Sequence, residues 1–177
     1  MSELAWCAFV APCAIAALGT LYAAVRSIRA APCIAATVPE PSAWPKLSMI
    51  VPACNEEGTL GAATRAKLAC DYPNLEVVIV EDRSTDATAR VADELAASDP
   101  RVRVLHVDEL PEGWLGKVHA LDQGVRASRG EWFLLSDADV HLSPTIVKRV
   151  IATAEERGLD FVAMMPHMIP GGFWLDV

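Results

Sequence analysis

Short apolar segments alternate with helix-forming segments through most of this chain, and that alternation limits the folds available to it. Apolar runs typical of strands lie at 46–52, 75–80, 102–107, 131–136 and 161–165. Helices, with their capping residues, are expected at about 56–70, 84–97, 116–128 and 143–156. Strands that are apolar almost throughout are typical of parallel sheets with both faces buried. The sequence therefore predicts an α/β fold with a mostly parallel sheet and helices on both faces.

The N-terminus has a different character, because Leu4–Val25 is a run of 22 residues without a charge. A helix of that length spans roughly 30 Å, the hydrocarbon thickness of a bilayer. Trp6 and Tyr22 lie near its ends, where aromatic rings favour the membrane interface. The leader contains Glu3 and no basic residue, which argues against a secretory signal peptide. We therefore expect residues 1–29 to form one transmembrane helix with its basic flank.

The residues that follow the apolar run predict the orientation of the chain and its division into domains. Arg26 and Arg29 come directly after the run, so the positive-inside rule places the rest of the chain on the cytoplasmic side of the cell membrane. Segment 30–45 is rich in proline and is expected to be an extended linker. Residues 46–177 carry the whole formal net charge of −8, which argues against a nucleic-acid partner.

Carboxylates follow three of the expected strands at the point where each strand ends. These segments are Pro52–Glu57, Glu81–Asp86 and Asp137–Asp139. In a parallel sheet the carboxyl ends of the strands meet at one edge, where ligands bind. Asp137 and Asp139 are two residues apart on an extended backbone, so both can reach one hard cation, such as Mg²⁺ or Mn²⁺. The alternative is a pair of solvated aspartates in a turn.

In order and spacing, these segments resemble family 2 glycosyltransferases, which have the GT-A nucleotide-sugar fold. The matching segments are Ser48–Glu57, Val80–Asp86, Gly113–Lys117 and Ser136–Asp139. The third of them is similar to the membrane-linked branch that includes ceramide glucosyltransferases and hopanoid-associated glycosyltransferases. The resemblance covers about residues 46–165 and implies a Rossmann-like sheet of the GT-A type.

The resemblance implies how a nucleotide sugar binds. Pro52, Asn55 and Glu56 would border the nucleotide. Asp82 would accept a hydrogen bond from the base, typically uracil, so a UDP-sugar is the expected donor. The alternative role for Asp82 is capping of the next helix.

The same resemblance assigns the phosphate side of the site. Asp137, Ala138 and Asp139 would lie along the ribose and the diphosphate, with Asp137 and Asp139 holding the divalent cation. Lys117 would add a positive charge near the phosphates. The alternative for Lys117 is an exposed lysine in the first turn of a helix.

The implied reaction is transfer of the sugar to an acceptor hydroxyl, usually with inversion and with a carboxylate as general base. An anchored domain favours a lipid or another membrane-associated acceptor. In related enzymes the base and a Gln-x-x-Arg-Trp-like motif lie beyond the Asp-x-Asp motif. No such motif follows Asp139, so the sequence is interpreted as truncated at its C-terminus, with the base expected beyond Val177.

Two other interpretations stay open from the sequence. The segment Phe133–Asp139 could be the nucleophile strand of a haloacid-dehalogenase-like phosphatase. That family expects Thr or Val where this chain has His141, and Glu81–Asp86 would have no role in it. The other alternative is a non-catalytic remnant that still binds a nucleotide sugar. A Rossmann dehydrogenase is excluded, because no Gly-x-Gly-x-x-Gly follows any expected strand.

Overall fold

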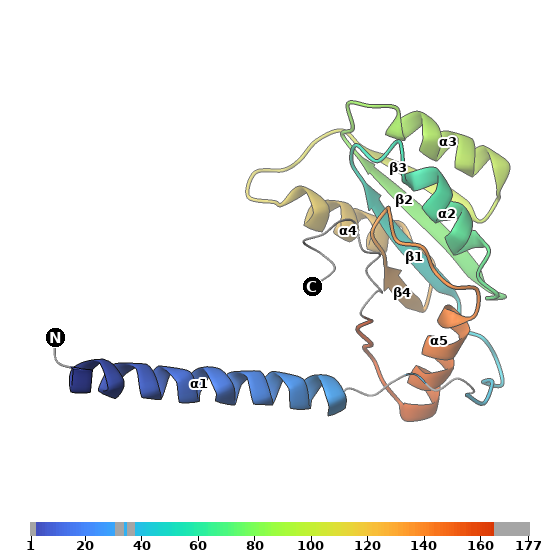
Figure 1. Cartoon of the computed structure of the whole chain (residues 1–177). Helices are drawn as coiled ribbons and strands as arrows, with labels where there is room; N and C mark the ends of the chain where they lie inside the picture. The colour runs from blue at the N-terminus through green and yellow to red at the C-terminus, as the bar shows by residue number, and fades with distance from the viewer. Residues whose placement is uncertain (1–2, 31–33, 35–37, 165–177) are drawn as a thin grey trace. The chain divides into compact units, whose positions relative to one another are not determined.

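The computed structural model describes residues 3–30, 34 and 38–164, and the chain divides into two compact units, Met1–Ala35 and Ala36–Val177. The first unit contains helix α1 (Glu3–Ala30), drawn in blue in Figure 1. In the described part of the chain, no helix reaches the length and apolar character needed to cross a bilayer. Of the expected linker, residues 31–33 and 35–37 lie outside the described residues.

The second unit is built around one sheet (Figure 1). Its strands are β1 (Leu47–Ala53), β2 (Leu75–Asp82), β3 (Val102–Val107) and β4 (Trp132–Leu135). Its helices are α2 (Leu60–Leu68), α3 (Thr88–Ser98), α4 (Gly116–Ala127) and α5 (Ile146–Arg157). The strand order is β3-β2-β1-β4 and every pairing is parallel, which confirms the predicted parallel α/β fold.

Strand β1 is the centre of this sheet and is paired along both edges. Leu47 lies opposite Leu75 of β2 on one side and opposite Trp132 of β4 on the other. Side chains that alternate along β1 and β2 therefore point to opposite faces, and each face is covered by helices. The first face packs against α2, α3 and α5 through residues that include Met49, Val51, Val77, Ile79, Leu60, Leu95 and Ile151. The second packs against α4 through Ile50, Val78, Val80, Ala120 and Leu121.

Three expected elements differ from the structure. The helix expected at 84–97 with its cap at Ser84 begins at Thr88, with Ala87 at the N-cap. The fifth strand expected at 161–165 is wrong for the residues described, since 161–164 pair with no strand and Phe161 is 82% exposed. A parallel strand needs a neighbour for its backbone groups, and 161–164 form no ladder with the edge strand β4. Helix α2 begins at Leu60 instead of about residue 56, and residues 57–59 form a turn before it, in which the carbonyl of Glu56 accepts the N–H groups of Thr59 (3.1 Å) and Leu60 (3.0 Å).

The close packing of α4 on the sheet depends on Gly124. A Cβ atom at this position would lie 2.4 Å from Ile50 Cγ2 and 2.9 Å from Val80 Cγ2, and both of these side chains are fully buried. We expect Gly124→Ala to lower the free energy of unfolding by about 1–2 kcal/mol, because overpacking outweighs the gain of about 1 kcal/mol in helix propensity. Urea unfolding measures the change. Gly58→Ala is the control, since nothing lies within 4 Å of that Cβ, and equal stability of the two variants would contradict the expected close contact.

Candidate functional site

A pocket of about 250 Å³ lies where the carboxyl ends of β1, β2 and β4 meet the first turns of α4. In the order β3-β2-β1-β4, the connection after β1 leads to β2 on one side and the connection after β3 returns to β4 on the other side of β1, and ligands of open α/β sheets bind at such a reversal of strand order. Seven of the eight predicted site residues line the pocket: Pro52, Glu56, Asp82, Lys117, Asp137, Ala138 and Asp139. The structure therefore brings together residues that are up to 87 positions apart in the sequence.

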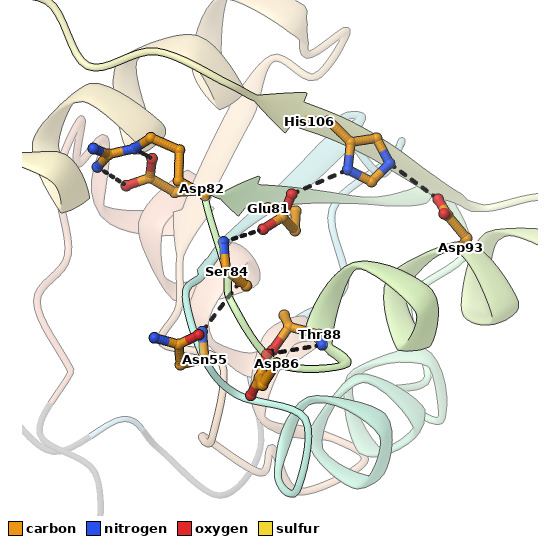
Figure 2. Close-up of polar contacts among 9 residues, drawn as sticks. Asn55, Glu81, Asp82, Ser84, Asp86, Thr88, Asp93 and His106 are labelled. Carbon is orange, nitrogen blue, oxygen red and sulfur yellow. Dashed lines mark hydrogen bonds and ion pairs between the residues drawn. The ribbon is translucent and has the colours of Figure 1, made fainter.

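Asn55 is the predicted site residue that does not line the pocket. Its backbone is in the left-handed region, with φ of 58°. Its side-chain Oδ1 accepts the N–H of Thr85 (2.8 Å), and its own N–H donates to Ser84 Oγ (3.2 Å; Figure 2). Asn55 therefore joins the loop after β1 to the loop after β2.

The next two residues strengthen the same junction. The N–H of Glu56 donates to Thr88 Oγ1 (2.7 Å), and Glu57 Oε2 accepts the N–H of Ala87 (2.9 Å). Asp86 also takes part, because its carboxylate accepts the N–H of Glu57 (3.3 Å). The hydroxyl of Thr88, which donates to this carboxylate, lowers the pKa of Asp86. The two loops on this side of the pocket are thus held together by direct hydrogen bonds.

Asp82 ends β2 and presents a buried carboxylate to the pocket. The residue is 5% exposed, and its two oxygens accept Arg83 Nε (2.7 Å) and Nη2 (3.2 Å). Arg83 has a φ of 55°, which turns the chain sharply after the strand. Gly116 allows this pair to approach the start of α4, since a Cβ there would lie 3.0 Å from Asp82 Oδ2. The guanidinium of Arg83 offsets the negative charge of a carboxylate that has little contact with water.

Asp137 and Asp139 form the opposite wall. Both are exposed, whereas Ala138 between them is 4% exposed and packs into the core, as expected for residues two apart on one side of the chain. Lys117 Nζ lies 2.7 Å from Asp137 Oδ1. Because Lys117 is in the first turn of α4, the partial positive charge of that helix terminus lies on the same side of the pocket.

The carboxylates of the pocket fit a divalent cation that needs few protein ligands. Among the described residues, no group of three or more His, Cys, Asp or Glu side chains could hold a metal ion by itself. Asp137 and Asp139 supply carboxylate oxygens at the pocket wall. Mg²⁺ and Mn²⁺ bind through few protein carboxylates and complete their coordination with water and phosphate oxygens. The residues present therefore suit a cation that binds together with a phosphorylated ligand.

Lys67 is a buried residue of this region that the sequence analysis did not identify. It is 0% exposed, and its Nζ donates to the carbonyl oxygens of Asp137 (3.1 Å) and Val140 (2.6 Å). Burial lowers the pKa of Lys67 to about 8, while the charges of Asp139 and Asp137 act in the opposite direction. The sequence did contain an indication that Lys67 is buried, because it continues the helical spacing of the buried residues of α2. These residues are Leu60, Ala63, Thr64 and Lys67.

Glu81 and His106 form a second polar group that the sequence did not reveal. Glu81 Oε1 accepts the N–H of Ser84 (2.7 Å), and its Oε2 lies 3.1 Å from His106 Nδ1 (Figure 2). The other ring nitrogen of His106 lies 3.1 Å from Asp93 Oδ1 of α3. Burial opposes ionisation of Glu81, but its hydrogen bonds with Ser84 and His106 outweigh burial and lower its pKa. This carboxylate supports the loop that begins with Asp82.

The protonated form of His106 is expected to stabilise the fold. The hydrogen bond to Glu81 raises the pKa of His106, with Asp93 acting in the same direction. Its contribution is therefore fully present below the unfolded-state pKa of about 6.5 and is lost as the pH rises through the higher folded-state value. Since the His106 side chain is 41% exposed, we expect His106→Gln to cost less than about 1 kcal/mol at pH 6 and still less at pH 9.

Urea unfolding of both proteins across this pH range measures the difference. Arg90→Gln is the control, because it removes an exposed ion pair with Glu94 that involves no histidine. A His106→Gln cost that grows with pH would contradict the raised pKa of His106.

Comparison with known proteins connects this architecture to enzymes. The sequence model of the family described as Glycosyl transferase family 2 matches residues 48–176. The succinoglycan biosynthesis protein ExoO of Rhizobium meliloti (strain 1021) is 33% identical over 64% of this chain and 31% of its own length. A beta-monoglucosyldiacylglycerol synthase of Synechocystis sp. is 32% identical over 66% of this chain and 24% of its own length. This chain thus spans about a third or less of the length of these two relatives.

Solved structures agree with the fold. The mannosyltransferase PcManGT from Pyrobaculum calidifontis, in complex with GDP-Man and Mn²⁺, is 26% identical, with a TM-score of 0.62 over 76% of this chain and 39% of that chain. S. aureus TarS in complex with UDP-GlcNAc has the same fold, with a TM-score of 0.56 at 24% identity over 64% of this chain and 32% of that chain. Together with the family match over most of the sheet unit, these likenesses favour a glycosyltransferase over the phosphatase alternative. The chain belongs to glycosyltransferase family 2.

Proposed function

We propose that residues 46–164 bind a nucleotide-diphosphate sugar, with a UDP-sugar as the expected donor, and take part in transferring its sugar to an acceptor hydroxyl. The observation that carries this proposal is the pocket itself. Carboxylates from the ends of β2 and β4 and the ammonium of Lys117 from α4 converge on about 250 Å³ at the point where the strand order diverges. Family membership supports the same reaction class.

The base of the donor binds at the β2 side in this proposal. The carboxylate of Asp82 is an acceptor for an N–H of the base, and it is held in place by Arg83. Pro52 and Glu56 line the adjoining wall. Asn55 contributes indirectly, because its hydrogen bonds to the loop after β2 hold that wall together.

The diphosphate binds at the β4 side. Asp137 and Asp139 would hold Mg²⁺ or Mn²⁺, which supplies charge neutralisation for the leaving diphosphate when bound. Lys117 lines the pocket 2.7 Å from Asp137, and its ammonium has further N–H donors for phosphate oxygens at the same wall. The complex of PcManGT with GDP-Man and Mn²⁺ supports a donor and a cation of these classes. Inversion at the anomeric carbon is expected, and a general base is assigned to none of the described residues.

The acceptor proposed is a lipid or another membrane-associated molecule, with α1 at the cell membrane and the second unit on the cytoplasmic side. Support comes from the uncharged run Leu4–Val25 and from the basic residues that follow it. Within α1, apolar side chains such as Ile15, Leu18 and Leu21 are exposed. One relative is named for a glycolipid product, a monoglucosyldiacylglycerol.

If the cation and the base bind on opposite sides of the pocket, substitutions on the two sides should weaken UDP binding in different ways. We expect Asp139→Ala to abolish the increase in UDP affinity that Mn²⁺ produces, because it removes one of two carboxylate ligands. Asp82→Asn should weaken UDP binding by about 10- to 100-fold with or without Mn²⁺, since a charged hydrogen bond to the base is lost. Titration calorimetry of the full chain with UDP measures both effects.

Inorganic pyrophosphate with Mn²⁺ is the control ligand, because it has no base. Its affinity should fall in Asp139→Ala and stay unchanged in Asp82→Asn. Unchanged Mn²⁺ dependence in Asp139→Ala would contradict the metal role, and equal losses for both ligands in Asp82→Asn would contradict the base contact.

Membrane attachment predicts a change in fractionation when α1 gains charge. We expect the full chain to sediment with membranes and the double variant Leu18→Lys, Leu21→Lys to shift to the supernatant. A lysine costs about 2.5–3.5 kcal/mol in the centre of an apolar segment and less towards its end, so two lysines are introduced together. Glu112→Lys, an exposed position in the second unit, is the control for added positive charge. The proposal of membrane attachment fails if the double variant and the control distribute alike.

A further inference from the structure

We propose that Lys67 is a positioning residue that holds the turn from Asp137 to Val140 in the conformation in which Asp137 and Asp139 face the pocket. This inference rests on the proposed function, because it concerns the same two carboxylates. Lys67 itself touches no part of the pocket surface. Its role is exerted through the backbone of the turn.

The contacts of Lys67 define the turn at both ends. Its ammonium donates to the carbonyl of Asp137 at the start of the turn and to the carbonyl of Val140 at its end. The same Asp137 carbonyl also accepts the N–H of Val140 at 3.3 Å, a long hydrogen bond. The hydroxyl of Ser136 donates to this carbonyl as well (3.3 Å), but Ser136 is the preceding residue and does not close the turn. Without the ammonium, the long hydrogen bond from Val140 is therefore what remains to close the turn at the Asp137 carbonyl.

Because Lys67 is buried, its ammonium is held at one position behind the turn. Lys67 is fully buried on the face of α2 that packs against the sheet. A lysine in such a position loses its hydration and needs polar partners, which the two carbonyl oxygens supply. The alternating pattern of the turn then places buried Ala138 inward and Asp137 and Asp139 outward.

Electrostatics gives the lysine a second effect on the same residues. The charges of Asp137 and Asp139 both act on the ammonium, which lies behind the wall that they form. Two carboxylates that converge on one cation repel each other before it binds. A fixed positive charge behind the turn reduces this repulsion, and Lys117 acts in the same way on Asp137 from the pocket side.

A matched control lies one helical turn away on the same buried face. Thr64 is 0% exposed, and its Oγ1 has no hydrogen-bond partner among the described residues. Thr64→Val therefore replaces a buried hydroxyl of α2 by a methyl group of similar size and removes no contact to the turn. Lys67→Met removes the charge and both hydrogen bonds while keeping a long side chain, and Lys67→Arg restores a charge and donors.

The first experiment needs no ligand. Hydrogen exchange of the full chain, followed in peptides that cover residues 137–140, should be faster in Lys67→Met than in the wild type and unchanged in Thr64→Val. Equal exchange in Lys67→Met and the wild type overturns the inference. This result does not depend on whether the chain binds a nucleotide, so it is separate from the proposed function.

The second experiment joins the turn to the site. Titration calorimetry with UDP and Mn²⁺ should show a loss of about 10- to 100-fold in the apparent Mn²⁺ affinity of Lys67→Met, as for other residues that orient metal ligands. UDP affinity without Mn²⁺ should change little, because Asp82 lies on another strand, and Lys67→Arg should recover part of the loss. A role limited to fold stability would instead weaken both modes of binding equally or neither, and either result overturns the inference.

Two further outcomes are distinguishable. Absence of UDP binding in the wild type contradicts the proposed function and leaves the exchange experiment as the test of Lys67. If Lys67→Met does not fold, Lys67→Gln is measured in the same way. It keeps an N–H donor and loses the charge, and unchanged exchange together with unchanged Mn²⁺ affinity in this variant overturns the inference.

Discussion

Parallel pairing of β1 along both of its edges is the constraint on which the rest of the structure depends. A buried strand must pair its backbone N–H and C=O groups, and β1 does so with β2 on one side and β4 on the other. These registers determine where each strand ends relative to its neighbours. The ladder continues past β4, because the N–H of Ser136 donates to the carbonyl of Ile50 at 3.0 Å. By this register Asp137 lies at the level of Pro52, close to the end of β1.

The carboxylates that gather at the carboxyl ends of the strands are stabilised by positive charges close to them. Asp82 is paired with Arg83 and Asp137 with Lys117, and Glu81 is paired with His106 when the imidazole is protonated. Lys67 adds a buried charge behind Asp137 and Asp139. Carboxylates that face one pocket raise each other's energy, and a cation close to each one lowers it. The same arrangement leaves the ammonium of Lys117 and the N-terminus of α4 beside the proposed diphosphate position.

Apolar periodicity was sufficient to predict the four strands and the helices between them, because each of these elements buries a regular face. The alternation of side chains along an extended backbone also predicted that Asp137 and Asp139 face the same way, and the buried Ala138 between them agrees with this prediction. Two kinds of feature were not predictable. The segment 161–164 is apolar but pairs with no strand. The helical spacing of α2 could indicate that Lys67 is buried, but not that its partners lie 70 or more residues away, and nothing local indicated that His106 contacts Glu81, 25 residues away. Local patterns do not encode such distant contacts.

The sequence by itself determined the local elements, the carboxylates at three strand ends and the uncharged N-terminal run. It also determined family membership, since order and spacing of the motifs are properties of the chain alone. Only the tertiary structure decided that the order is β3-β2-β1-β4, that Asn55 joins two loops and that Lys67 reaches the turn after β4. The physical reason is that strand order and buried polar contacts depend on which distant surfaces pack together. Chains with the same local pattern of strands and helices can pack these surfaces in different ways.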